Sequence, residues 1–124
     1  MSYSTQWIDN DLIVSYEGEL SFKVLFTANT EIYRDKRFRE MTFQVVDLRG
    51  ISTSSLNEEE TTSLGNQEVA ASMINNHIKI AIVFDNPDYI MSNSQAYIDA
   101  LADTGWQLQG FDDINKALEW CRSK

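Results

Sequence analysis

Several residue types that would mark particular classes of protein are scarce in this chain of 124 residues. One cysteine, Cys121, cannot form a disulfide within the chain, and one histidine, His77, is too few for a metal site made of several histidines. The longest apolar run, near 78–84, has about seven residues, whereas a membrane-spanning helix needs about 20. The first residues lack the basic region and apolar stretch of a signal peptide. We therefore expect no cofactor, no structural metal and no integral membrane segment.

Positive charge is also scarce. The chain carries 10 Lys and Arg residues against 19 Asp and Glu residues, so its net charge is −9. An acidic chain of this kind is repelled by the phosphates of nucleic acids and by anionic membrane surfaces. Its length and its 43% hydrophobic residues are ordinary for one globular domain, which we expect to span 1–124. These properties predict a single cytoplasmic domain that does not bind nucleic acid.

The N-terminal third changes from a strand pattern to a helix pattern. Two stretches, 3–8 and 12–17, flank Asp9-Asn10-Asp11 and predict an antiparallel hairpin. From Ser21, a candidate N-cap, the spacing of the apolar residues becomes that of a helix. The apolar residues that fall largely on one face of this helix are Phe22, Leu25, Phe26, Ile32 and Tyr33.

The middle of the chain predicts a strand, a loop and a helix. The strand covers 41–48 and is followed by a turn at Gly50 and by a loop of serines and threonines at 52–55. Asn57 is a candidate N-cap of the next helix, and Glu60 completes a capping box with it. We expect that helix to end near residue 75. The residues that it should bury are Leu64, Ala71 and Ile74.

The C-terminal half repeats the alternation of strands and helices. The run 78–84 is almost continuously apolar, as in a strand that is covered on both faces. A helix capped by Asn86 should follow and end at Gly105, a strand should cover 106–109, and Asp112 should cap a last helix. The predicted order is ββαβαβαβα, an α/β fold with a mixed central sheet and right-handed crossovers. The residues expected to be nearly inaccessible on central strands are Val45, Ile80 and Ile82.

Polar residues gather where two strands of the predicted sheet end. Asp47 closes one buried strand and Asp85 the next, and Arg49 and Gly50 follow Asp47. Because α/β domains bind ligands at this edge, these four residues form a candidate interaction seam. The two carboxylates, with Asp88, are oxygen ligands of the kind that Mg²⁺ takes. The favoured alternative is that they orient loop backbone groups and cap helices.

Two further groups of polar residues each allow two interpretations. The serines and threonines at 52–55 either accept a phosphate, which a helix N-terminus stabilises, or only cap the loop. The basic residues of 34–39 either dock an acidic partner or an anionic head group, or form a solvated loop. No acid–base pair or nucleophile–base pair can be assembled, because His77 precedes a strand and so lies at the opposite edge of the sheet. We therefore expect no enzymatic activity.

Four segments, taken in order, resemble the SpoIIAA-like (STAS-like) family of small bacterial proteins. They are DLIVSYEGELS, FQVVDLRGIS, IKIAIVFD and FDDINKALEWC, and the resemblance covers nearly the whole chain. It implies a STAS-like fold, a mixed sheet with helices packed largely on one side. In the anti-sigma-factor antagonists of the family, a phosphorylated serine lies in a D-S-S-G motif after a D-L-S-G strand. This chain has D-L-R-G at 47–50 and then Ser54-Ser55, without the aspartate before the pair or the glycine after it.

The resemblance implies a non-enzymatic regulatory domain that binds a protein partner, with Ser54 and Ser55 as candidate phosphorylation sites. The partner can also be a second copy, giving a homodimer. The alternative is a module that binds a lipid or another small apolar ligand. The residues that would line the site of that ligand are Phe22, Phe26, Met91 and Tyr97.

Two surfaces are candidates for self-association. One is the edge strand of the hairpin, because an unpaired strand edge invites pairing with another chain. The other consists of aromatic residues at helix ends and in loops, which a monomer should leave exposed to water. These aromatic residues are Tyr33, Phe38 and Tyr89.

Overall fold

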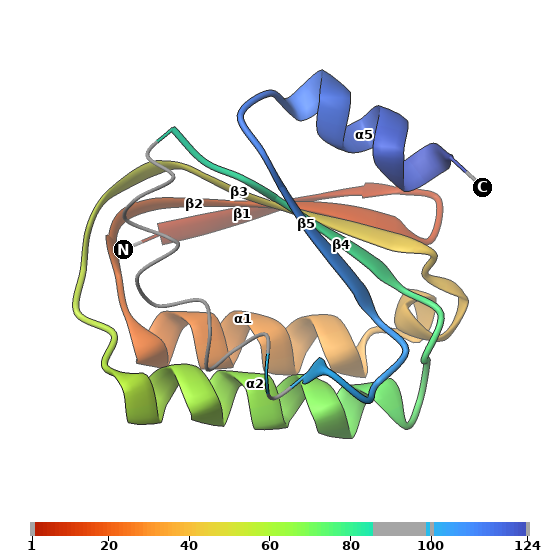
Figure 1. The fold of residues 1–124 in the computed structure, drawn as a ribbon, viewed down its shortest axis with the longest axis horizontal. Coiled ribbons are helices and arrows are strands. Elements are labelled where there is room, and N and C mark those ends of the chain that lie inside the picture. Colours follow the sequence, from red (N-terminus) through yellow and green to blue (C-terminus); the bar gives the residue numbers. More distant parts are fainter. Residues whose placement is uncertain (1, 86–98, 100, 124) are drawn as a thin grey trace.

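The computed structural model describes residues 2–85, 99 and 101–123, and its centre is one mixed five-stranded sheet (Figure 1). The strands are β1 (Ser2–Ile8), β2 (Asp11–Leu20), β3 (Phe43–Ser54), β4 (Lys79–Val83) and β5 (Gln107–Phe111), and they lie side by side in that order. The pair β1 and β2 is antiparallel, and the three later pairs are parallel. The predicted mixed sheet with an antiparallel hairpin at its edge is confirmed.

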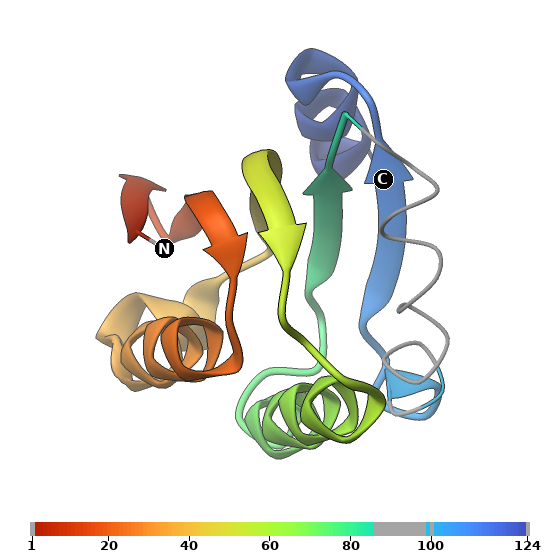
Figure 2. The same cartoon turned by 90° about the vertical axis from the view of Figure 1, so that its left-hand side faces the viewer.

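Helices cover both faces of the sheet, but unequally. They are α1 (Phe22–Arg34), the 3₁₀ helix η1 (Lys36–Glu40), α2 (Glu58–Ser72) and α5 (Ile114–Arg122). Figure 2 shows α1 and α2 on one face and α5 on the other. This arrangement agrees with the prediction of helices largely on one side. The helix predicted to begin after Asn86 lies for most of its length outside the described residues.

Successive residues of the central strands belong to two separate hydrophobic clusters. In β3, Val45 belongs to the cluster under α5, and Val46 packs against the larger cluster under α1 and α2. In β4, Ala81 belongs to the first cluster, and Ile80 and Ile82 lie at the second. Because both faces are covered, consecutive residues of these strands are apolar, as at 45–46 and 80–83. Val45 and Ile80 are buried as predicted, whereas Ile82, one residue from the end of β4, is only partly buried.

The helices begin at residues that satisfy their free backbone N–H groups. Ser21 caps α1 as predicted, and Asn57 and Glu60 form the predicted capping box of α2, with distances of 2.7 and 3.1 Å. The cap of the last helix is Asp113, one residue later than the predicted Asp112. Its carboxylate reaches two N–H groups of the first turn of α5, which fixes where that helix starts.

The end of α2 differs from the prediction. The helix stops at Ser72, short of the expected residue 75. Leu64 and Ala71 are buried as predicted. Ile74 is not: it is 52% exposed, and its neighbour Met73 is 85% exposed, because the chain leaves the helix at this point.

β3 is longer than predicted, and it has no turn at Gly50. It runs to Ser54, so most of the segment 52–55, expected to be a loop, is strand. A register shift against β2 inserts an extra residue of β3 between Asp47 and Gly50. A Cβ atom on Gly50 would lie 2.8 Å from the carbonyl oxygen of Tyr16, so only glycine lets the two backbones approach here. The glycine therefore marks a β-bulge within the strand.

The aromatic residues near η1 are less exposed than predicted. Phe38 has no exposed surface, because the 3₁₀ turn points its ring into the core, 4.9 Å from the ring of Tyr33 and 6.4 Å from that of Trp106. Tyr33 is partly buried, and Tyr89 lies outside the described residues. The prediction that Phe38 lies in water is wrong.

Candidate functional site

The predicted seam lies at the edge of the sheet where the parallel strands end. β4 pairs with β3 only from Phe43 to Asp47, whereas β2 pairs with it as far as Ser54. Within the described part of the chain, residues 48–54 therefore have a neighbouring strand on one side only. We call this segment the β3 overhang; it leads into α2 (Figure 1). Backbone groups on the open side of such a strand are available to pair with another chain.

An ion pair lies at the base of the overhang, on the face of the sheet that α5 covers. The Nε and Nη2 atoms of Arg49 donate to the two carboxylate oxygens of Asp47 at 2.9 and 2.8 Å. The backbone N–H of Arg49 donates to the same carboxylate at 3.1 Å. The pair is bidentate, which fixes the plane of the guanidinium group. The Arg49 side chain keeps 40% of its surface exposed, so this oriented group is presented to solvent.

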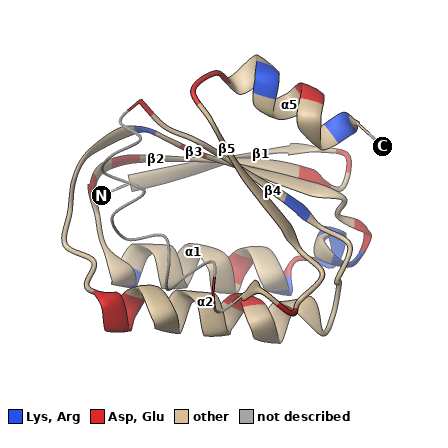
Figure 3. Cartoon of the chain, in the orientation of Figure 1, with Lys and Arg blue, Asp and Glu red and all other residues tan. Residues whose placement is uncertain are grey.

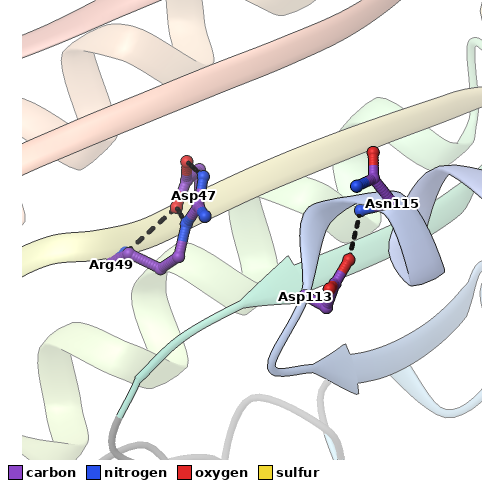
Figure 4. A network of polar contacts seen from close by, with 4 residues as sticks. All are labelled: Asp47, Arg49, Asp113 and Asn115. Atoms are coloured by element: carbon purple, nitrogen blue, oxygen red, sulfur yellow. Dashed lines mark hydrogen bonds and ion pairs between the residues drawn. The ribbon is translucent and has the colours of Figure 1, made fainter.

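Further carboxylates act on this pair. The hydrogen bonds from Arg49 lower the pKa of Asp47, so its carboxyl group is ionised near neutral pH. Asp47 raises the pKa of Arg49 most, and the negative charges of Asp85 and Asp113 add to the effect. Asp113 lies just before α5, where its carboxylate accepts the backbone N–H of Asn115 (Figure 4). Of the predicted seam residues, Asp47 and Arg49 are thus in direct contact, whereas Asp85 acts on Arg49 only through its charge.

Sequence reasoning did not include Asp113 in this group. The sequence predicted a cap at Asp112, but the charge of Asp113 acts on Arg49 because α5 packs on the same face of the sheet. Among the residues that the structure describes, no three His, Cys, Asp or Glu side chains lie close enough together to hold a metal ion. Asp88, the third candidate magnesium ligand, lies outside those residues.

The two candidate serines lie where the overhang meets α2, and both hydroxyl groups have partners. The Oγ atom of Ser54, which is partly buried, accepts the backbone N–H of Leu56 at 3.0 Å. Ser55 is exposed, and its N–H and its hydroxyl group both donate to the carbonyl oxygen of Leu20, at 3.0 and 3.2 Å. The serines therefore close the connection between β3 and α2 and tie it to the end of β2.

The first turn of α2 is strongly acidic. Glu58 and Glu59 are exposed, and Glu60 accepts the backbone N–H of Asn57. These carboxylates suit the positive end of the helix dipole. A phosphate group on Ser54 would meet the same dipole, but also the negative charge of the glutamates. Phosphorylation here would therefore change the local charge strongly.

The candidate lining of an apolar ligand site is only partly described. The rings of Phe22 and Phe26 lie 5.5 Å apart on α1, and Phe26 is 42% exposed. Met91 and Tyr97 lie outside the described residues.

Two hollows are lined by described residues, and neither Phe22 nor Phe26 lines either of them. One hollow, of about 510 Å³, lies between the hairpin turn and the end of α5 and includes Cys121. Burial raises the pKa of the Cys121 thiol to about 11, so it remains protonated at neutral pH. The other hollow lies at the end of α1.

The sequence matches no known protein-family profile and no curated protein. Two solved structures nevertheless superpose on almost all of it. An uncharacterized protein of the DUF3478 family from Shewanella loihica PV-4 aligns with 97% of this chain and 92% of its own, at 13% identity and a TM-score of 0.56. The anti-sigma factor antagonist SpoIIAA, in its unphosphorylated form, aligns with 98% of this chain and 96% of its own, at 9% identity and a TM-score of 0.62. The chain has a SpoIIAA-like fold.

At these identities the likeness concerns the fold alone, and it confirms the fold that the sequence resemblance implied. In the SpoIIAA-like fold of this chain, the seam and the two serines lie at the junction of β3 and α2. No helix in the described ranges has both the length and the apolar character needed to cross a membrane.

Proposed function

We propose that this chain is a non-enzymatic regulatory domain of the cytoplasm, which binds a protein partner through the junction of β3 and α2. The observation that carries the proposal is the β3 overhang, where a strand offers one open side within the described part of the chain. The oriented guanidinium group of Arg49 stands at its base, and the acidic first turn of α2 follows its end. Backbone pairing and fixed charges together suit recognition of another chain.

Phosphorylation of Ser54 is the proposed means of regulation. SpoIIAA, which has this fold, is an anti-sigma factor antagonist with an unphosphorylated form. Ser54 lies at the end of the overhang, and its Oγ atom is a hydrogen-bond acceptor in the turn. An aspartate at this position keeps an acceptor for the same N–H and adds the charge, so Ser54→Asp imitates the modified state without removing the turn.

The test uses the purified domain as bait in the source cell extract, followed by binding measurements with the identified partner. Arg49→Glu reverses the charge at the base of the overhang, and we expect it and Ser54→Asp each to weaken binding about tenfold or more. Ser54→Ala removes only a turn acceptor, so it should cost at most about 1 kcal/mol of stability and leave binding unchanged.

Asn66→Asp is the matched control, because Asn66 is exposed on α2 and the change adds the same charge away from the junction. It should bind as the unchanged protein does. Equal affinity of Arg49→Glu, Ser54→Asp and the unchanged domain for the partner, with all variants folded, would falsify the proposed site.

A second candidate function, binding of a lipid or other small apolar ligand, rests on one observation. Phe26 keeps 42% of its surface exposed beside Phe22, an unusual place for a phenylalanine in a soluble domain. Native mass spectrometry of freshly purified protein would show a bound ligand as added mass. If that mass persists in Phe26→Ser, the ligand does not lie at this pair.

A further inference from the structure

A basic hollow lies at the end of α1, away from the β3–α2 junction. It has a volume of about 460 Å³ and lies where α1, η1 and the residues after α2 meet. We call it the η1 hollow. Its lining residues are Tyr33, Arg34, Asp35, Lys36, Arg39 and Ile74. Three of the 10 Lys and Arg residues of a chain with a net charge of −9 thus line one hollow. In Figure 3 the blue of Lys and Arg marks η1, which follows α1.

The cations that line the η1 hollow are not paired with acidic side chains of the described part of the chain. In the part of the chain that the structure describes, Arg34, Lys36 and Arg39 form no ion pair. Arg34 lies in the last turn of α1, where the helix dipole favours a cation, but Lys36 and Arg39 lie beyond that helix. Glu40, at the end of η1, is exposed and is the one acidic residue of that 3₁₀ helix. The three cations therefore exceed the free carboxylates around the hollow.

The frame that holds these cations is fixed by buried contacts. The lining carboxylate Asp35 is already held by Arg37, whose Nε and Nη2 atoms donate to it at 2.9 and 2.8 Å. The buried Asn75 donates through Nδ2 to the carbonyl oxygens of Phe38 and Met41 at 2.9 and 2.8 Å, which ties η1 to the end of α2. A site whose backbone is already ordered loses little entropy when a ligand binds.

A large apolar side chain lies beside the cations. Ile74 lines the η1 hollow and keeps 52% of its surface exposed. Apolar surface next to unpaired cations is the composition of a protein-binding site with an apolar centre and a charged rim.

We propose that the η1 hollow is a docking site for an acidic peptide segment of a partner protein. Carboxylates of the segment meet Arg34, Lys36 and Arg39, and an apolar side chain between them packs on Ile74. A two-fold dimer through this surface is disfavoured, because it would set the same three cations against themselves. An anionic membrane is disfavoured because its surface extends past the hollow and is repelled by the net charge of −9 of the whole domain. A short peptide, by contrast, meets only the charges within about 8 Å, the screening length at physiological salt.

This site is distinct from the proposed seam. The first turn of α2 adjoins the seam and Ile74 follows its last turn, and a helix of 15 residues is about 22 Å long. Substitutions in the two places can therefore be tested separately. The peptide experiment below does not depend on the seam or on its partner.

The probe is a short synthetic peptide with blocked ends, Gly-Glu-Glu-Leu-Glu-Glu-Gly, titrated into ¹⁵N-labelled full chain at low salt. We expect amide signals of 33–41 and 72–76 to shift, and those of the β3 overhang to stay. The double variant Arg34→Glu with Arg39→Glu should weaken binding about tenfold or more, because it reverses two of the three charges that the carboxylates of the peptide meet. Ile74→Ser should weaken binding severalfold without changing its dependence on salt.

The matched control is Lys23→Glu with Lys116→Glu, which changes the net charge by the same amount on exposed residues of α1 and α5. It should bind the peptide as the unchanged protein does. A peptide with glutamine in place of every glutamate should not bind.

Three results would overturn the proposal. The first is an absence of shifts at 33–41 and 72–76. The second is that the unchanged protein sediments with vesicles of phosphatidylcholine and phosphatidylserine and the Arg34→Glu, Arg39→Glu variant does not. That result would assign the hollow to a membrane. The third is that the unchanged protein self-associates and this variant does not. That result would assign the hollow to contact with a second copy of the chain.

Discussion

Gln44 places a primary amide inside the sheet. It lies in β3 between Leu12 of β2 and Ile80 of β4, and only 3% of its surface is exposed. Among the described residues, its Oε1 atom has no hydrogen-bond partner. A buried polar atom without a partner costs about 1–3 kcal/mol, because it has lost its water without a replacement. At this position a polar residue therefore lowers stability.

Gln44→Met should raise the free energy of unfolding by about 1 kcal/mol, because methionine has a similar shape and no unpaired oxygen. Urea denaturation measures the change. Gln107→Met, at an exposed position of β5, is the control and should change stability by less than about 0.5 kcal/mol. A less stable Gln44→Met protein would show that the amide has a partner in solution.

Asp35 gives stability a dependence on pH. The hydrogen bonds from Arg37 lower the pKa of Asp35 from 3.8 to about 2. Because the folded pKa lies below the unfolded one, the ion pair stabilises the fold above about pH 4, and this contribution is lost as the pH falls toward about 2. The pair is partly exposed, so the contribution should stay below about 1 kcal/mol.

Asp35→Asn tests this dependence, because asparagine keeps an acceptor for the Arg37 N–H but carries no charge. The natural protein should be the more stable of the two at about pH 6, and the difference should vanish near pH 2. Chemical denaturation at several pH values measures it. A difference that stays constant between these limits contradicts the assignment.

At the scale of secondary structure, the sequence predicted where helices begin better than where helices and strands end. Ser21, Asn57 and Glu60 were predictable because a cap depends on the residues just inside the same helix. The length of β3 was not, because the bulge at Gly50 exists only against β2, and a glycine in sequence suits a turn equally well. The inward position of Phe38 likewise depends on a contact far along the chain, the Asn75 side chain that holds η1.

The two halves of β3 should differ in hydrogen exchange. We expect the amides of Val45 and Val46, together with those of 80–83, to be among the most protected, because strands cover both sides of them. Amides of the β3 overhang that point away from β2 should exchange at least about tenfold faster. Equal protection along the whole of β3 would mean that another segment pairs with the overhang.

At the scale of the whole molecule, net charge and edge geometry act against each other. β1 is the outer strand of the sheet, and Ser2, Ser4, Thr5 and Gln6 on it are exposed, so its free edge invites pairing with a second copy. A net charge of −9 on each copy opposes that pairing. At physiological ionic strength, salt largely screens the repulsion between charges more than about 8 Å apart. It leaves the backbone hydrogen bonds between the paired strands in place.

We therefore expect a dimer that becomes tighter as the salt concentration rises, measured by light scattering at micromolar concentrations. Thr5→Lys should abolish it, because a lysine on an edge strand blocks pairing. Thr5→Lys makes the net charge less negative than in the unchanged protein. If the variant does not dimerise, greater repulsion between the two copies is therefore not the cause. A strict monomer at both low and high salt would refute the expectation.

The division of β3 and β4 between two clusters also limits how the chain can change during evolution. Val45 packs under α5 and Val46 on the opposite side, and Ala81 and Ile82 alternate in the same way. Inserting or deleting one residue before them would reverse both sets, so each cluster would receive side chains shaped for the other. Changes of chain length should therefore accumulate in the connecting segments, while the central strands keep their length even in relatives that share few residues with this chain.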